Sequence, residues 1–159
     1  MADFKRKLEE LGYSEVRTLL NSGNAVVSSP ARSSAKHAQA IAAMVKQSFG
    51  VDTPVIVRSA AELSAVIKHC PMVPAEEHHS RFLVAFGQDR SALQSLVPLV
   101  PLASGPERFV VTDEAAYLSS PDGLLESKVG AAILGKAGRA VTTRNWATVL
   151  KLKVLLSAA

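Results

Sequence analysis

The chain has 159 residues, of which 48% are hydrophobic and 20% charged, and it carries a net charge of +4. This length suffices for one full domain or for two small halves that share a core. No apolar run approaches the roughly 20 residues of a membrane-spanning helix, and a single cysteine, Cys70, excludes an internal disulfide framework. The N-terminal sequence also lacks the apolar stretch of a secretory signal, so we expect a cytoplasmic protein without a membrane segment.

The first half of the chain alternates helical and extended patterns. In chain order, the patterns predict a helix ending before Gly12, two strands within residues 15–29 joined by a turn at Ser22-Gly23-Asn24, a helix over 31–50, a strand over 53–59 and a helix over 60–70. Ser59 and Glu62 have the spacing of a capping box, which marks the start of the last of these helices.

The second half repeats the theme with one more strand at its start. In chain order, the patterns predict a strand over 81–87, a helix over 89–100 broken at Pro98, two strands within 108–120 around an acidic turn, a helix over 128–136 capped by Ser127, a short extended piece over 140–144 and a last helix capped by Asn145. Residues 120–123 have the Pro and Gly of a tight turn.

These two element orders match if the first half lacks a strand before its first helix. The complete order, βαββαβ, is the ferredoxin-like plan. We therefore predict an α+β fold of two ferredoxin-like halves in tandem, over residues 1–70 and 81–159, with a linker at 71–80. Without its N-terminal strand, the first half would expose a sheet edge to pairing with another chain.

Four motifs carry a resemblance to a known family. The stretches LNSGNAVVSS, VIVRSAAEL, AYLSSPDGLLESKV and TTRNWATVLKL, in this order and spacing, resemble the bacterial DUF1697 family of uncharacterised proteins. The resemblance covers essentially the whole chain and implies an α+β fold of ferredoxin-like halves, with no established activity. Members of the family usually begin earlier, with a strand and a glycine-containing loop, and Ala147 stands where they usually have a polar residue.

Positive charge is concentrated near the C-terminus. Residues 126–159 hold one acid, Glu126, against six basic residues: Lys128, Lys136, Arg139, Arg144, Lys151 and Lys153. Such a segment attracts phosphate groups and nucleic acid. The alternative interpretation is a solvated helix face with no ligand.

The stretch TTRNW, residues 142–146, is the first candidate site. Asn145 as N-cap would leave free N–H groups and a helix dipole that favour an anion. Thr143 and Arg144 precede that helix start, and Arg144 has the geometry to clamp a carboxylate or a phosphate. Trp146 has a ring that could stack on a base. The alternative is that Trp146 packs in the core, Asn145 only caps, and Arg144 pairs with an acid.

Three further candidates lie at a predicted helix start or turn. Ser127-Lys128 repeats a capping residue followed by a base, which could neutralise a phosphate. Ser22-Gly23-Asn24 could aim backbone amides at a ligand, and Arg58 lies between a predicted strand and the Ser59 cap. Ordinary capping, ordinary turn chemistry and a salt bridge from Arg58 to Glu62 are the competing interpretations.

Catalytic and metal motifs are weak by comparison. Adjacent His69 and Cys70 on a helix point in different directions, and residues 76–79, EEHH, lack a known metal-ligand spacing. We predict no metal and no cofactor. Binding of a nucleic acid or a phosphorylated small molecule ranks first among the functions. A structural or partner-binding protein, such as a homodimer through a sheet edge, ranks second, and an enzyme acting on a small anionic substrate third.

Overall fold

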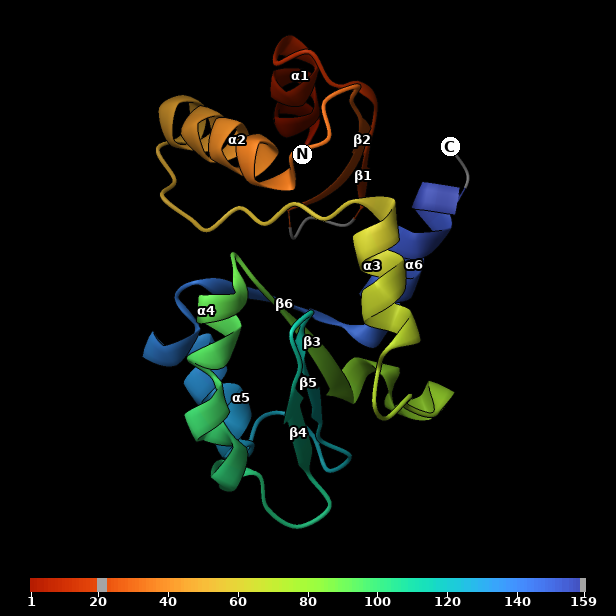
Figure 1. The fold of residues 1–159 in the computed structure, drawn as a ribbon, viewed down its shortest axis with the longest axis vertical. Helices are drawn as coiled ribbons and strands as arrows, with labels where there is room; N and C mark the ends of the chain where they lie inside the picture. The colour runs from red at the N-terminus through yellow and green to blue at the C-terminus, as the bar shows by residue number, and fades with distance from the viewer. Residues whose placement is uncertain (20–22, 158–159) are drawn as a thin grey trace.

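The computed structural model describes residues 1–19 and 23–157 of a mixed α+β protein with two separate sheets (Figure 1). Its α-helices are α1 (Ala2–Glu10), α2 (Ser34–Phe49), α3 (Ala60–Lys68), α4 (Arg90–Gln94), α5 (Lys128–Leu134) and α6 (Trp146–Ser157). Its strands are β1 (Ser14–Leu19), β2 (Asn24–Ser28), β3 (Phe82–Gly87), β4 (Arg108–Val111), β5 (Ala116–Ser119) and β6 (Val141–Asn145). Short 3-10 helices are η1 (Glu76–Arg81), η2 (Val97–Leu102) and η3 (Lys136–Gly138).

The larger sheet has four strands in the spatial order β4-β5-β3-β6, and all its pairings are antiparallel. Strand β3 is central, since Val84 pairs with Tyr117 of β5 on one side and with Arg144 of β6 on the other. Five of the six β3 residues are buried. A strand covered on both faces reads as a near-continuous apolar run, which explains the sequence FLVAFG.

Helices cover both faces of this sheet (Figure 1). Helices α4 and α5 enclose one apolar cluster, whose buried residues are Ala85, Ala92, Leu93, Leu96, Phe109, Ala116, Leu118, Val129, Ile133 and Val141. Helices α3 and α6 enclose a second cluster on the opposite face, whose buried residues are Leu63, Val66, Phe82, Val84, Phe86, Ala115, Tyr117, Trp146 and Val149. Helix α3, from the first half of the chain, therefore packs on the sheet of the second half.

The N-terminal part forms a smaller layer around the β1–β2 hairpin. Helices α1 and α2 pack on one face of the hairpin. Buried side chains of these helices, of β1 and of the residue before β1 form a third apolar cluster: Leu8, Tyr13, Val16, Ile41 and Met44. The β1–β2 register shifts between Ser14 and Arg17, and Glu15 there adopts a positive φ of 50°. This irregularity is a β-bulge, which twists the outer edge of β1.

The helix boundaries follow from local chemistry, as the sequence predicted. The Ser59 side chain accepts from the Glu62 N–H at 3.1 Å, and the Glu62 carboxylate accepts from the Ser59 N–H at 2.8 Å, which completes the predicted capping box. Gly50 ends α2 with a φ of 67°, in the left-handed region where glycine costs least. Helix α5 ends at Leu134, two residues before the predicted end, and a 3-10 turn continues it.

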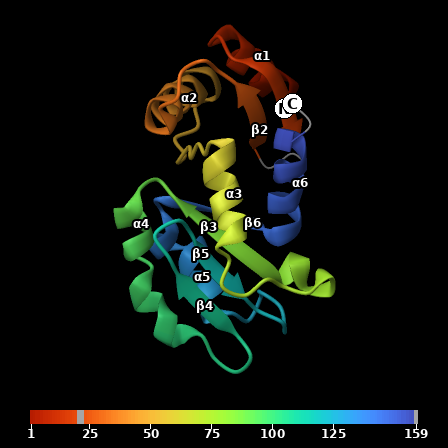
Figure 2. The same ribbon diagram turned by 45° about the vertical axis from the view of Figure 1, so that its right-hand side comes forward.

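The prediction of a strand over residues 53–59 was wrong. Val55, Ile56 and Val57 are strong β formers, yet residues 51–59 form neither helix nor strand (Figure 2). A strand requires a neighbour for its N–H and C=O groups, and none of the described strands pairs with this segment. Among the described residues, the first half consequently has a two-stranded sheet and the second half a four-stranded one.

Candidate functional site

Arg144 links the two sheets through its guanidinium. Its Nε donates to Oδ1 of Asn24, at the start of β2, at 2.6 Å. Its Nη1 donates to the Thr142 hydroxyl at 2.9 Å and to the Thr143 carbonyl at 2.7 Å. Asn24 is buried, and its amide donates to the Leu19 carbonyl at 3.2 Å. The structure thus brings together two predicted site residues, Asn24 and Arg144, that lie 120 positions apart.

Arg58 makes a similar link at another point of the junction. Its Nη1 donates to the Val57 carbonyl at 3.1 Å and its Nη2 to the carbonyl of Gly87, at the end of β3. Burial lowers the pKa of Arg58, and the negative charge of Glu62 partly opposes this shift. Burial also lowers the pKa of Arg144. Among the described residues, no carboxylate lies within ion-pair distance of Arg58, so the salt bridge to Glu62, the competing interpretation of this residue, does not form.

The rest of the TTRNW stretch has structural roles. The Asn145 side chain accepts from the Thr148 N–H at 2.9 Å, which is the predicted N-cap of α6. Trp146 is 3% exposed and packs edge-on against Phe82, with ring centroids 5.4 Å apart. Its ring therefore lies inside the core and is not accessible for stacking on a base.

The Ser127-Lys128 candidate lies away from the junction. Ser127 is buried and caps α5 by accepting from the Gly130 N–H at 2.9 Å, and Lys128 is exposed. Next to Ser127 is a cavity of about 140 Å³ that Glu107, Asp122 and Glu126 also line. These three acids disfavour an anion there. Of the predicted turn, Gly23 has a φ of 79°, and Ser22 lies outside the described residues.

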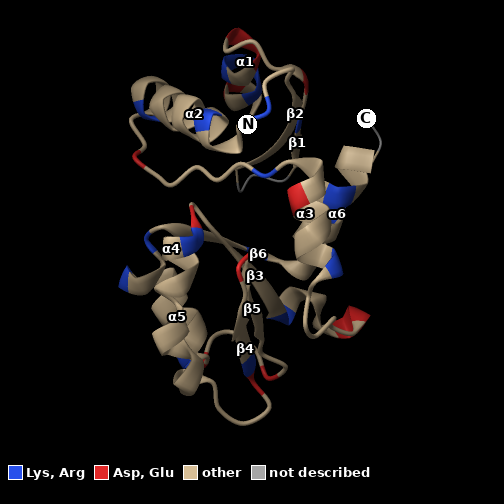
Figure 3. Ribbon diagram, in the orientation of Figure 1, with Lys and Arg blue, Asp and Glu red and all other residues tan. Residues whose placement is uncertain are grey.

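The basic residues near the C-terminus do not form one surface. They are spread over separate elements: Lys128 on α5, Lys136 on η3, Arg139 directly after η3, Arg144 on β6, and Lys151 and Lys153 on α6. Figure 3 shows Lys and Arg, in blue, scattered over several helices and loops. The structure brings Arg144 to the junction and leaves Lys128 on the helix layer that covers the opposite face of the four-stranded sheet. The charge pattern in the sequence therefore does not translate into a single basic patch.

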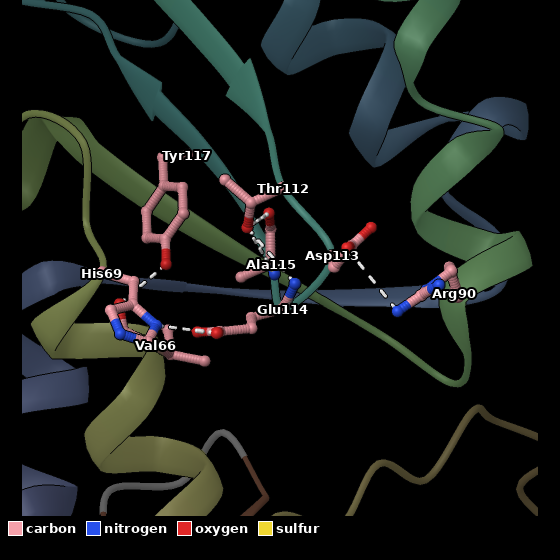
Figure 4. A network of polar contacts seen from close by, with 8 residues as sticks. All are labelled: Val66, His69, Arg90, Thr112, Asp113, Glu114, Ala115 and Tyr117. Atoms are coloured by element: carbon pink, nitrogen blue, oxygen red, sulfur yellow. Dashed lines mark hydrogen bonds and ion pairs between the residues drawn. The ribbon is translucent and has the colours of Figure 1, made fainter.

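A polar network that sequence reasoning missed joins α3 to the β4–β5 turn (Figure 4). His69 Nδ1 lies 2.7 Å from Oε1 of Glu114, and the Tyr117 hydroxyl donates to the Val66 carbonyl at 2.7 Å. The Cys70 N–H donates to the Ile67 carbonyl. The Val66 carbonyl, near the end of α3, accepts from the Tyr117 hydroxyl instead. The partners are 45 and 51 positions apart, and only the tertiary fold brings them together.

Cys70 does not have the properties of a reactive thiol. Burial raises the pKa of Cys70, although a backbone hydrogen bond from Met72 partly opposes this. A raised pKa keeps the sulfur protonated, and the thiolate is the nucleophilic form. No group of three or more His, Cys, Asp and Glu side chains within residues 1–19 and 23–157 has the geometry of a metal site.

An apolar groove of about 340 Å³ lies between the end of β1 and α6. It is lined by Leu19, Leu150, Lys151, Val154 and Leu155. Val154 is 67% exposed, so α6 presents an apolar side chain to solvent beside this groove. The groove carries one cation and no acid among its lining residues.

The two outer edges of the β1–β2 hairpin differ in how well they are protected. Strand β1 carries a bulge and the charged residues Glu15 and Arg17, which are common protections of an edge strand. Strand β2, with the sequence NAVVS, has no charge, no proline and a regular register from Asn24 to Val26. Among the described strands, β1 is the only one that pairs with β2. The edge of β2 that faces away from β1 therefore has the features of an acceptor for another strand.

Comparison with known proteins identifies a family and a fold. A family model described as "Protein of unknown function (DUF1697)" matches residues 1–117. A solved structure, that of the conserved bacterial protein SP0830 from Streptococcus pneumoniae, is similar with a TM-score of 0.78 and 19% identity, covering 98% of this chain and 88% of that one. At this identity the likeness shows the fold alone. No curated protein matches the chain.

Within the described ranges, no helix combines the length and the apolar character that a transmembrane span requires.

Proposed function

The chain belongs to the DUF1697 family of proteins of unknown function, and we propose that it is a partner-binding protein that accepts an extended strand at the open edge of β2. The observation that carries this proposal is the contrast between the two edges of the hairpin. The edge of β1 is bulged and charged, and the edge of β2 is regular and uncharged. Backbone hydrogen bonds supply the affinity in such strand addition, and side-chain contacts supply the specificity.

The fold supports this proposal if the halves are copies of one ferredoxin-like plan. In residues 82–157 the element order is strand, helix, strand, strand, helix, strand, helix, as expected from the sequence. In residues 1–68 the order is helix, strand, strand, helix, a segment that is neither helix nor strand, helix. The two series coincide when β2 corresponds to β5 and residues 55–58 correspond to β6. Under this alignment, residues 1–68 contain the counterparts of β4, β5 and β6.

The two arginines at the junction support the same alignment. Arg58 and Arg144 each directly precede the capping residue of a helix, Ser59 in one case and Asn145 in the other. Each guanidinium donates to the carbonyl of the residue before it and to a group in the opposite half. Two such similar arrangements at corresponding places are the pattern expected of an internal repeat.

Selection of peptides on the purified full chain tests partner binding. A phage-displayed library of random heptapeptides is panned on the protein, and synthetic versions of the selected peptides are added during amide hydrogen exchange. We expect slower exchange of the amides of Ala25, Val26 and Val27, because a new strand would engage their outward groups. If no peptide is enriched, or if the bound peptides leave these amides unprotected, the proposal fails.

A pair of proline variants provides the control. Successive N–H groups of a strand point to opposite edges, so one of Val26→Pro and Val27→Pro removes a donor to β1 and the other removes an outward donor. The variant that retains the far-UV circular dichroism of the wild type identifies the outward donor. That variant is expected to lose peptide binding while remaining folded.

A second candidate function, binding of an anionic ligand, is favoured by Arg58. Its guanidinium is half-buried, its hydrogen-bond partners are carbonyl oxygens, and an anion would offset the cost of its burial. Titration of inorganic phosphate and of labelled single- and double-stranded oligonucleotides at two salt concentrations tests this function. We expect Arg58→Gln to weaken binding and Lys128→Gln, on a separate element, to leave it unchanged. Flat titrations at low salt would eliminate this candidate.

A further inference from the structure

We infer that two copies of this chain form a dimer through the outer surface of the layer of α4, η2 and α5. We call this surface the layer face; its exposed residues lie within 90–106, 122–126 and 128–139. It has an apolar centre, an acidic cavity at one end and two basic side chains at the other. In the dimer, the basic end of each copy lies on the acidic cavity of the other. This dimer is separate from the strand addition proposed at β2.

The apolar centre follows from a repeat in the sequence of η2. The element reads VPLVPL, and side chains three positions apart lie above one another in a 3-10 helix. Leu99 belongs to the row that faces the sheet, since it packs against the cluster enclosed by α4 and α5. The other two rows, Val97 with Val100 and Pro98 with Pro101, are exposed. The element η2 therefore presents two uncharged apolar rows to solvent.

Helix α5 packs against η2 and adds to this apolar centre. Its Val129 and Ile133 are buried, whereas Ala131 is exposed and Leu134 is 73% exposed. Exposed apolar side chains that gather on one layer mark an interaction site. The two prolines of η2 also fix the backbone, so this surface loses little conformational entropy on association.

The acidic cavity lies where η2 ends and α5 begins. Its volume is about 140 Å³, and its lining residues come from the segment after η2, from the turn at 120–123 and from the segment before α5. Glu107, Asp122 and Glu126 line it, and no basic side chain of the described residues does. Since a water molecule takes up roughly 30 Å³, the cavity has room for the ammonium or guanidinium group of an entering side chain.

The cavity also holds two acceptors that share one donor. The Ser120 hydroxyl lies 2.8 Å from Oε2 of Glu107 and 2.8 Å from the Gly123 carbonyl. A hydroxyl has one hydrogen, so it donates to only one of these two oxygens. An ammonium or guanidinium group that enters the cavity would donate to the other.

Helix α5 runs from this cavity back along η2 to the start of α4. The Gln88 N–H, just before α4, donates to the Ala140 carbonyl at 3.1 Å, which places the chain after η3 beside the start of α4. Lys136 on η3 and Arg139 directly after it therefore lie at the end of the layer face that is remote from the cavity.

The basic end offers two cations to an outside acid. Lys136 and Arg139 are exposed, and in the described part of the chain no acid lies within ion-pair distance of either. The nearby Arg90 differs, because it forms an ion pair with Asp113 at 3.6 Å. Asp89, the acid at this end, is the cap of α4.

Opposite charges at the two ends of an apolar surface make the layer face complementary to itself. A two-fold axis through η2 would place the copies antiparallel, so that each contact occurs twice, as in other symmetric dimers. The segments of the layer face hold about 20 exposed residues, and a standard interface uses roughly 20–30 a side. Helices α3 and α6 cover the opposite face of the sheet, so they leave the layer face open to a second copy (Figure 1).

Size-exclusion chromatography of the full chain with light scattering is the first test. We expect the molar mass to rise from one copy to two with protein concentration, and the dissociation constant to rise with salt, because salt screens the charged contacts. A monomer at every concentration up to about 1 mM would overturn the inference.

Charge reversal at each end tests the contacts themselves. The acid-end variant carries Asp122→Lys and Glu126→Lys, and the base-end variant carries Lys136→Glu and Arg139→Glu; all four side chains are exposed. Each variant alone should dimerise at least about tenfold more weakly, because like charges would meet at both contacts. An equimolar mixture should restore the wild-type affinity, since both contacts again join opposite charges.

Two outcomes of this experiment contradict the inference. If either variant dimerises as the wild type does, the layer face is not the interface. If the mixture stays monomeric while circular dichroism shows both variants folded, the two ends do not meet. Neither outcome affects strand addition at β2, because the four substituted residues lie on other elements.

A pair of valine variants tests the apolar centre separately. Val100→Asp would bury a charge between the copies and should weaken the dimer at least about tenfold. Val154→Asp is the matched control, because Val154 is an exposed valine on α6, which covers the opposite face of the sheet. The control should dimerise as the wild type does. Equal effects of the two variants, or loss of the dimer in the control alone, would place the interface elsewhere and refute the inference.

Discussion

The two halves of this protein have closely similar orders of helices and strands, and they form different sheets. In the C-terminal half, β3 pairs on both sides and completes a four-stranded sheet that helices cover on both faces. In the N-terminal half, β2 has one neighbour, and the β-rich segment 55–57 belongs to no strand. In the C-terminal half, β5 and β6 belong to one sheet because each pairs with one edge of the central strand β3. The difference shows that two such strands join one sheet only through the strand between them.

The junction between the halves depends on polar contacts as well as apolar ones. Arg58 reaches from the first half to Gly87, and Arg144 reaches from the second half to Asn24. Hydrogen bonds from a charged donor are stronger than neutral ones. These contacts hold the N-terminal half on the C-terminal half.

The largest expected effect is in the core of the complete half. Phe82 is fully buried between Tyr117 and Trp146, and Phe82→Ala should cost about 3–5 kcal/mol of unfolding free energy. Met44→Ala in the N-terminal cluster should cost less, about 2 kcal/mol, because that cluster is smaller. Urea unfolding followed by circular dichroism measures both. Equal costs would contradict the view that the complete sheet dominates stability.

The second effect concerns the junction. Asn24→Ala removes the Oδ1 acceptor from Arg144, and loss of a buried hydrogen bond to a charged group should cost about 1–3 kcal/mol. Amide hydrogen exchange should then be faster throughout β1 and β2 and unchanged in β3. Uniformly faster exchange in both sheets would show that the halves unfold as one unit.

Two helix caps provide a matched comparison between the halves. Ser59→Ala removes the capping box of α3, and Ser127→Ala removes the cap of α5. Each should cost about 1 kcal/mol. Because α3 packs on the sheet of the second half, Ser59→Ala should lower the urea midpoint of the whole protein. Unfolding curves followed by tryptophan fluorescence and by circular dichroism should shift by the same amount. A shift confined to the N-terminal hairpin would contradict this packing.

Tyr117 gives a smaller effect that depends on pH. Tyr117→Phe removes the donor to the Val66 carbonyl and should cost about 0.5–1.5 kcal/mol at neutral pH. Burial, and then the nearby charges of Cys70 and Glu114, raise the pKa of Tyr117 above its ordinary value of 10.0. The folded state therefore binds this proton more tightly, and its contribution to stability is present below pH 10 and is lost as the pH rises further.

Urea titrations at pH 8 and at pH 11 measure this dependence. The loss of stability between the two pH values should be smaller in Tyr117→Phe than in the wild type. Tyr13 retains its own raised pKa in both proteins and serves as an internal control. An identical loss in both proteins would show that Tyr117 does not titrate with unfolding.

The smallest effect is expected at the exposed contact between His69 and Glu114, which joins the end of α3 to the β4–β5 turn. His69 and Glu114 are 2.7 Å apart, with side chains 55% and 36% exposed. Exposed pairs contribute about 0–1 kcal/mol, so Glu114→Gln should change the unfolding free energy by less than about 1 kcal/mol. A larger loss in the same urea titration would show that this network, rather than the apolar cluster, positions α3.

The sequence predicted the features that depend on neighbouring residues. The capping box at Ser59, the caps at Ser127 and Asn145, and the end of α2 at Gly50 are all present, because a cap is formed within three or four positions of the chain. The mixed α+β class and the family were also recognised from patterns and motifs. These features need no knowledge of which segments meet.

Contacts between segments far apart in the sequence became known only from the tertiary structure. The sequence could not show that Arg144 contacts Asn24, that Lys128 lies away from both, or that Trp146 is buried in the core. It also predicted a strand over residues 53–59 from β-branched side chains, and the fold supplies no neighbour to pair with it. Propensity is a property of a segment, whereas a strand is a property of at least two segments, and that second segment is decided by the packing of the whole chain.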